Sequence, residues 1–216
     1  MNRIEELIDR LAADAVPVRP LRPPLARALA WLLAATLICG SMILLFGDIQ
    51  ELLARYQGRE RMMGLEIAAM LATGVLAVIG AFFAAVPGQS RRWLLAPIAP
   101  FAAWLLLSGA GCYRELVRNG TSGVEIGHSV DCLVFIVGSS LLLGVPLIWL
   151  LSRARPIEPL PVALLGGLGT AALGAFTLQF FHPFAVTFID LGFHLVAIAI
   201  VMGVAAALNR RALSPA

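Results

Sequence analysis

Cysteine and histidine have the widest chemistry of the side chains in this sequence, and the chain has three of each. Thiolate and imidazole are preferred ligands of copper and zinc. The residues that could hold a metal ion or change redox state, with one acidic neighbour, are Cys112, His128, Asp131, Cys132, His182 and His194. All six lie in the second half of the chain, so helices that meet at one end must bring them together.

Cys112 and Cys132 have three interpretations. They form a structural disulfide in an oxidising compartment, they form a labile bond that responds to oxidants, or their thiolates bind a metal ion with one or more of the histidines. The four-residue spacing of His128 and Cys132 places both on one helical face if a helix begins before them. A histidine can instead cap a helix or bond within its own loop. Cys39, inside an apolar segment, is expected to fill space there.

The elements that must position these residues are membrane-spanning helices. The chain is 60% hydrophobic and 13% charged, whereas a soluble domain has about 25% charged residues. Segments of about 20 apolar residues can cross a bilayer, and only helices satisfy their backbone groups there. Six segments qualify: Leu25–Phe46, Leu65–Val86, Trp93–Ala110, Cys132–Leu151, Leu160–Phe181 and Thr187–Leu208. We therefore predict an all-α bundle of six transmembrane helices, with a kink in the third at Pro97 or Pro100.

The distribution of arginine predicts the orientation of this bundle. With the N-terminus inside, the cytoplasmic segments carry eleven of the 16 positive charges and the outer loops carry five. The positive-inside rule then places both termini in the cytoplasm. In this topology Cys112, Cys132 and the three histidines lie near the extracytoplasmic face. Glu66 and Asp190 lie near the same face, and ionisable residues in spanning helices are often functional.

The N-terminal residues 2–15 predict a short amphipathic helix outside the membrane. Its apolar positions fall at helical spacing along one stripe, and Asn2 with Glu5 has the spacing of a capping box. One interpretation is a helix that lies on lipid headgroups, and the other is a helix that fits a groove of a soluble partner. Four acidic residues against two arginines favour the partner. The residues expected to bind it are Ile4, Glu5, Leu7, Ile8, Asp9 and Leu11.

Two further patterns concern spacing and packing. Four prolines between residues 17 and 24 form a stiff spacer that would hold the N-terminal helix away from the membrane. Gly166, Thr170 and Gly174 form a row of small residues in the fifth predicted span. Such rows let helices approach closely, and we expect this one to serve packing inside the bundle in preference to a dimer interface.

Several short segments, in this order and spacing, resemble one known family. They are Ile8–Asp14 with the Pro/Arg run that follows, Ala85–Trp93, Gly127–Cys132, and Phe181-His182-Pro183 with His194 beyond. The chain resembles the NrsF-type family of bacterial membrane anti-sigma factors, and this resemblance extends over nearly the whole chain. It implies a multi-pass protein of the inner membrane that sequesters an extracytoplasmic-function sigma factor. It also implies release of that factor on an extracytoplasmic heavy-metal or oxidative signal, with Cys112 or Cys132 matching cysteines of the family.

The family resemblance and the distribution of apolar segments together divide the chain into three parts. Residues 1–24 would bind the sigma factor, residues 25–208 would form the transmembrane domain, and residues 209–216 would be a cytoplasmic tail. We expect membrane lipid as a further partner, no direct contact with nucleic acid, and no obligatory cofactor. A regulatory copper, zinc or cadmium ion would bind the Cys/His cluster. The family resemblance implies a stress response in which the Cys/His cluster senses the signal and the N-terminal helix then releases the sigma factor.

Two other function classes fit part of the sequence. A small transporter or channel for a metal ion or proton would use Glu66, Asp190 and the histidines as its pathway. Against it, the middles of the six segments carry almost no ionisable residues. A haem-binding membrane enzyme would need two histidines on facing helices, whereas these histidines lie near predicted helix ends. Because the sequence has no nucleophile–base pattern and no phosphate-binding loop, we expect no enzymatic activity.

Overall fold

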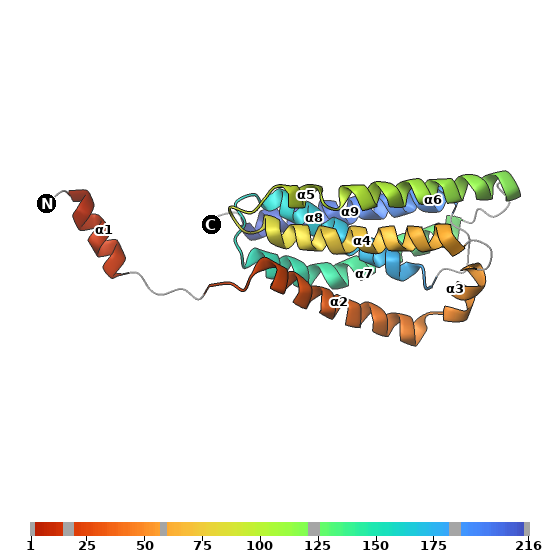
Figure 1. Ribbon diagram of the computed structural model, residues 1–216, viewed down its shortest axis with the longest axis horizontal. Coiled ribbons are helices and arrows are strands. Elements are labelled where there is room, and N and C mark those ends of the chain that lie inside the picture. The colour runs from red at the N-terminus through yellow and green to blue at the C-terminus, as the bar shows by residue number, and fades with distance from the viewer. Residues whose placement is uncertain (1–2, 15–19, 57–59, 121–125, 182–186, 214–216) are drawn as a thin grey trace.

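The structure is a computed structural model that describes residues 3–14, 20–56, 60–120, 126–181 and 187–213, apart from the side chains of 51–52, 55–56, 60–61, 119, 126–128 and 209–213. Within these ranges it contains helices and no strand (Figure 1). The helices are α1 (Arg3–Ala13), α2 (Pro24–Phe46), α3 (Ile49–Tyr56), α4 (Glu60–Ala84), α5 (Arg92–Leu95), α6 (Ile98–Asn119), α7 (Ile126–Ser152), α8 (Pro159–Leu178) and α9 (Phe188–Leu213). Six segments of this part of the chain are long and apolar enough to cross a membrane, with α5 and α6 together forming the third.

Helix α8 forms the centre of the bundle. It packs against α4, α7 and α9, and 72% of its most apolar window is buried. The corresponding fraction is 17% for α2 and for the α5–α6 span, which lie at the periphery. The buried residues of α2, which are Ala28, Trp31 and Ala35, fall in its first half, so α2 is attached to the bundle mainly near its N-terminal end.

Glycines of α8 allow this close packing on several sides. A Cβ atom on Gly167 would lie 2.8 Å from the Cα of Met202 in α9, and one on Gly174 would lie 2.6 Å from Ser139 Oγ in α7. A Cβ atom on Gly169 would lie 2.8 Å from a methyl group of Val78 in α4. The small residues of this segment therefore serve packing within the bundle, as the sequence predicted.

The third span is broken at a proline, which confirms the expected kink. Helix α5 ends at Leu95 and α6 begins at Ile98, with Pro97 at the N-cap of α6. The predicted ends of two spans were wrong. Helix α6 continues to Asn119 instead of ending at Ala110, so Cys112 lies within it. Helix α7 begins at Ile126 instead of Cys132, so His128 and Asp131 belong to the helix and not to a loop.

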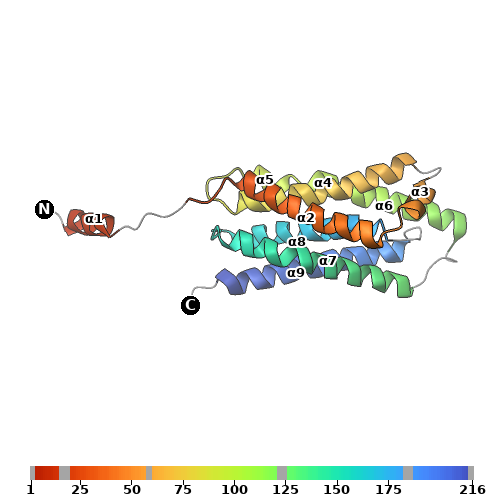
Figure 2. The ribbon, with the colours of Figure 1, turned by 90° about the horizontal axis from the view of Figure 1, so that it is seen from below.

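The other differences lie at the ends and in one connection. Helix α3 was not predicted, α4 begins at Glu60 instead of Leu65, α8 ends at Leu178 instead of Phe181, and α9 continues past Leu208 to Leu213. Helix α1 confirms the predicted amphipathic helix; it lies apart from the bundle in both views (Figures 1 and 2). The first residues of α2 and the last of α9 lie at the same end of the bundle (Figure 1). We call this the terminal end and the opposite one the distal end.

Candidate functional site

Buried polar side chains from four helices gather near the distal end of the bundle. We call this group the distal polar layer. It consists of Glu66 of α4, Ser108 and Cys112 of α6, Ser129 and Cys132 of α7, and Asp190 and His194 of α9. Each of these side chains is buried except that of Glu66, which is partly buried. Because burying polar groups is unfavourable unless they are paired, their partners indicate what the layer can do.

Asp190 connects α9 to α7 and also caps α9. Ser129 Oγ donates a hydrogen bond of 2.5 Å to Asp190 Oδ1. Asp190 Oδ2 accepts from the backbone N–H and the hydroxyl of Thr187, at 2.9 and 2.8 Å, and the backbone N–H of Asp190 donates to Thr187 Oγ1 at 3.3 Å. This reciprocal pattern is a capping box. Both carboxylate oxygens are therefore occupied by bonds that fix the position of α9.

Glu66 connects α4 to α6 in a similar way. Ser108 Oγ donates a hydrogen bond to Glu66 Oε1. One turn before Ser108, the side chain of Trp104 is 1% exposed and packs with Phe101. The hydroxyl of Ser108 is itself buried, and a hydrogen bond to a charged group is stronger than one between neutral groups. Each carboxylate of the layer thus joins two helices through a serine.

The two cysteines of the layer lie near its carboxylates. Cys112 is one turn after Ser108 in α6 and lies close enough to Glu66 and Asp190 for electrostatic interaction. Cys132 is three residues after Ser129 in α7 and interacts in the same way with Asp190 and Asp131. Both are 2% exposed, and neither forms a disulfide in the structure. His194 follows Asp190 by one turn on α9 and is 5% exposed.

The structure brings together some of the predicted metal or redox residues. Cys112, Cys132 and His194, with Glu66 and Asp190, belong to the layer, whereas the side chain of Asp131 is exposed. His128 is on the first turn of α7, but its side chain, like the whole of His182, lies outside the described residues. Among the side chains that are described, no three of the His, Cys, Asp or Glu type are placed to hold a metal ion. Metal binding with His128 or His182 stays a prediction.

The hydroxyl partners of the layer were not predicted from the sequence. Ser108 and Ser129 give no periodic signal, and their partners are 42 and 61 residues away in the chain. Thr187 carried a recognisable signal, because Thr-x-x-Asp before an apolar run is typical of a helix start.

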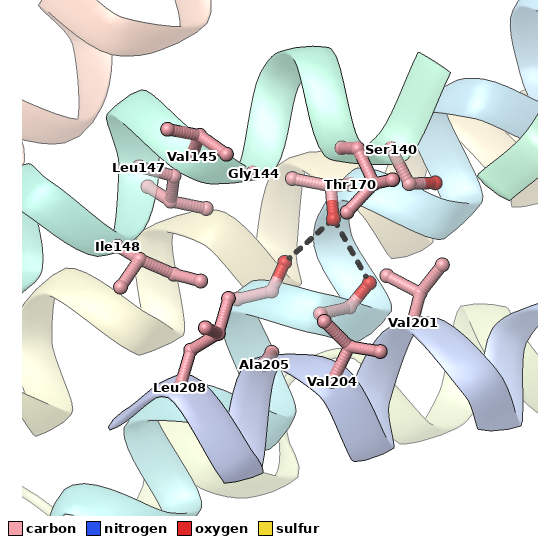
Figure 3. Close-up of a pocket in the computed structure, with 13 residues that line it drawn as sticks. Ser140, Gly144, Val145, Leu147, Ile148, Thr170, Val201, Val204, Ala205 and Leu208 are labelled. Carbon is pink, nitrogen blue, oxygen red and sulfur yellow. Dashed lines mark hydrogen bonds between the residues drawn. The ribbon is translucent and has the colours of Figure 1, made fainter. Parts of the chain in front are cut away.

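A small hollow lies between α7, α8 and α9 outside this layer (Figure 3). Its lining is apolar apart from Ser140 and Thr170, and the hydroxyl of Thr170 donates back to the carbonyls of Gly166 and Gly167 in its own helix, at 3.2 and 3.1 Å. With no charged residue in its lining, this hollow is a packing defect between helices and offers no chemistry.

A second candidate site is the apolar stripe of α1. Ile4, Leu7, Ile8 and Leu11 are exposed by 64, 57, 57 and 65% respectively. Glu5 and Asp9 are exposed on the same helix. Large apolar side chains that remain exposed together mark an interaction surface. The predicted partner-binding residues therefore lie on a helix that is free of the bundle.

The sequence matches a family model described as "NrsF: Negative regulator of sigma F" over residues 11–214. The chain belongs to this family. It is also similar to a protein of Syntrophomonas wolfei subsp. wolfei (strain DSM 2245B / Goettingen) named "Lipoprotein signal peptidase", with 31% identity over 118 residues that cover 53% of this chain and 76% of that protein. No solved structure matches the chain.

Membership of the NrsF family identifies a sigma factor as the partner of this chain. The six apolar segments are compatible with a multi-pass membrane protein. The NrsF match begins at Leu11, so most of the α1 stripe precedes the matched region. In this NrsF-family chain the two candidate sites, the α1 stripe and the distal polar layer, are separated by the length of the bundle (Figure 1).

Proposed function

We propose that this chain is an inner-membrane anti-sigma factor that holds an extracytoplasmic-function sigma factor through α1. In this proposal the distal polar layer receives a heavy-metal or oxidative signal and causes release. The observation that carries the proposal is the exposed apolar stripe of α1, joined to a helical membrane bundle in a chain of the NrsF family. A free amphipathic helix needs a partner to cover its apolar side chains, and a sigma factor is the partner of this family.

The proposed orientation follows from two observations. The bundle begins and ends at its terminal end, and the arginine count of the segments there favours the cytoplasm. A sigma factor acts in the cytoplasm, so α1 has to be on that side. The distal polar layer then faces the extracytoplasmic side, where metal ions and oxidants arrive.

The chemistry of α1 defines the surface it would bind. The helix has 11 residues and is about 16 Å long, too short to be stable alone in water. Its apolar stripe fits a hydrophobic groove, and the acidic side chains of Glu5 and Asp9 on the same helix suit a partner with basic residues around that groove. The binding site therefore presents side chains of both kinds to the sigma factor: Ile4, Glu5, Leu7, Ile8, Asp9 and Leu11.

Two kinds of signal, a metal ion and an oxidant, are compatible with the chemistry of the layer. A soft metal ion (copper, zinc or cadmium) would bind the thiolates of Cys112 and Cys132 together with His128 or His182. Alternatively, an oxidant would accept two electrons from the two thiols, which would lose two protons and form a disulfide. Either reaction draws α6 and α7 together. Both helices are tied to neighbours through Ser108–Glu66 and Ser129–Asp190, so the change would spread to α4 and α9.

The bonding of Glu66 and Asp190 supports a regulator over a transporter. An ion pathway needs carboxylates that can exchange partners, whereas both oxygens of Asp190 are engaged in joining or capping helices. We also propose that the chain has no enzymatic activity of its own. The similarity to lipoprotein signal peptidase makes that proposal testable, because the purified chain should leave a lipoprotein precursor uncleaved.

The decisive test of partner binding uses the full chain with the sigma factors of its own organism. Leu7→Asp places a charge in the middle of the α1 stripe and should abolish co-purification and raise transcription from the target promoter without any stimulus. Glu6→Gln changes the opposite face of the same helix and serves as the matched control. If the Leu7→Asp chain retained the sigma factor as well as the control does, α1 would not be the binding element.

A further inference from the structure

Arg27, in the first turn of α2, joins two other helices at the terminal end. Its Nη2 atom donates a hydrogen bond to the backbone carbonyl of Leu150 near the end of α7. Its guanidinium carbon lies 5.2 Å from the ring centroid of Phe82 in α4. Its Nη1 atom is buried and has no hydrogen-bond partner among the described residues. Buried donors are nearly always paired in proteins, so this N–H group lacks an acceptor.

A second cation lies near the Arg27 guanidinium. Arg153 is close enough to Arg27 for electrostatic interaction, and its guanidinium carbon lies 3.7 Å from the ring centroid of Trp149. Glu158, the first acidic residue after Arg153 in the chain, is bonded to a different arginine, Arg91, at 2.6 Å. Two adjacent arginines repel each other, and an anion that both could contact would remove that repulsion.

The position of the two arginines in the bundle indicates the source of the anion. Arg27 follows the start of α2 by three residues and Arg153 follows the last residue of α7, so both lie where spans enter and leave the membrane. Trp149 is 56% exposed on the outside of the bundle, and tryptophan and arginine together are typical of the headgroup level of a bilayer. Basic sites between helices at this level bind acidic headgroups.

We propose that Arg27 and Arg153 form a binding site for the phosphate of an anionic membrane lipid between α2 and α7. The phosphate oxygens accept from the unpaired Arg27 N–H and from the Arg153 guanidinium, and the acyl chains lie along the exposed apolar side chains of α2. The lipid then fastens α2, the helix that follows α1, to the end of α7. Lipid binding would strengthen the attachment of α2 to the bundle, which is made through the N-terminal half of that helix.

The test measures lipid retained by the full chain after purification from membranes with equal phosphatidylglycerol and phosphatidylcholine. Native mass spectrometry should show a preference for phosphatidylglycerol in the wild-type chain, reduced about fivefold by each of Arg153→Gln and Arg27→Gln. Arg92→Gln, at an exposed arginine of the same end, should leave the preference unchanged. Arg153 is exposed, so its substitution tests the site even if Arg27→Gln disturbs folding.

Three results would overturn the proposal. The first is an equal preference for phosphatidylglycerol in the wild-type and Arg153→Gln chains. The second is a loss of this preference in the Arg92→Gln control as large as that in Arg153→Gln. Such a loss would indicate a general effect of surface charge. The third is complete displacement of bound phosphatidylglycerol by millimolar inorganic phosphate, which would show that the arginines bind a free anion and not a lipid.

Discussion

Asp190 shows how one residue can position a site without being its reactive group. Its carboxylate caps α9 through Thr187 and accepts a hydrogen bond from Ser129 of α7. The sequence predicted an intramembrane polar residue at this position but could not identify its partners. A serine hydroxyl has no periodic signature, and this one is 61 residues away.

Loss of the Ser129 hydroxyl should destabilise the bundle. Ser129→Ala removes a hydrogen bond to a buried carboxylate, and such bonds contribute about 1.5–3 kcal/mol. We expect a lower midpoint of thermal unfolding in detergent. Ser41→Ala is the control, because its exposed hydroxyl bonds only to the carbonyl of Ile38 in its own helix. Equal midpoints for the two variants would show that the Ser129–Asp190 bond contributes nothing.

The two cysteines of the layer should be needed for the response to a signal. Cys112→Ser and Cys132→Ser replace thiols with poor ligands for soft metals, so induction of the target promoter by cadmium or by an oxidant should be lost. Cys39→Ser, in α2 and outside the layer, should respond normally. Normal induction in both layer variants would remove the layer from the signalling mechanism.

At the scale of elements, the sequence predicted helices from long apolar runs and failed where helices continue with polar residues. Helix α6 extends nine residues past its predicted end, through Tyr113 and Arg114 to Asn119. These residues are compatible with a helix but fall outside an apolar window. The difference matters, because it places Cys112 inside the bundle. Pro97 was a clearer signal, since proline interrupts backbone hydrogen bonding.

The central position of α8 depends on its glycines. Gly167→Ala would place a methyl group 2.8 Å from the backbone of Met202, and overpacking of this kind destabilises proteins by about 1–3 kcal/mol. Gly203→Ala on α9 meets no atom within 4 Å and should be neutral or slightly stabilising. Thermal unfolding in detergent compares the two variants. A Gly167→Ala chain as stable as wild type would contradict the close approach of α8 and α9.

At the scale of the whole molecule, the proposed sensing site and the proposed sigma-factor-binding helix lie at opposite ends of the bundle. Helix α7 extends from one end to the other. One end of α7 carries Ser129 and Cys132, and the carbonyl of Leu150 near the other end accepts a hydrogen bond from Arg27 of α2. In the proposed mechanism, a rearrangement of α7 would therefore reach the helix that follows α1. The sequence predicted both ends of this route, through the stripe of Ile4, Leu7, Ile8 and Leu11 and through the cysteines. It did not predict the contact of Arg27 with α7, because a contact across 123 residues leaves no local pattern.

The most direct test of this account measures the dissociation constant of the sigma factor for the full chain in nanodiscs, with and without cadmium. A metal ion can shift the equilibrium only through its differential affinity for the two states, and a hundredfold release needs about 2.7 kcal/mol of coupling. We predict tight binding without metal and a dissociation constant raised roughly a hundredfold with it. Equal dissociation constants in the two conditions, with cadmium bound to the chain, would contradict the account.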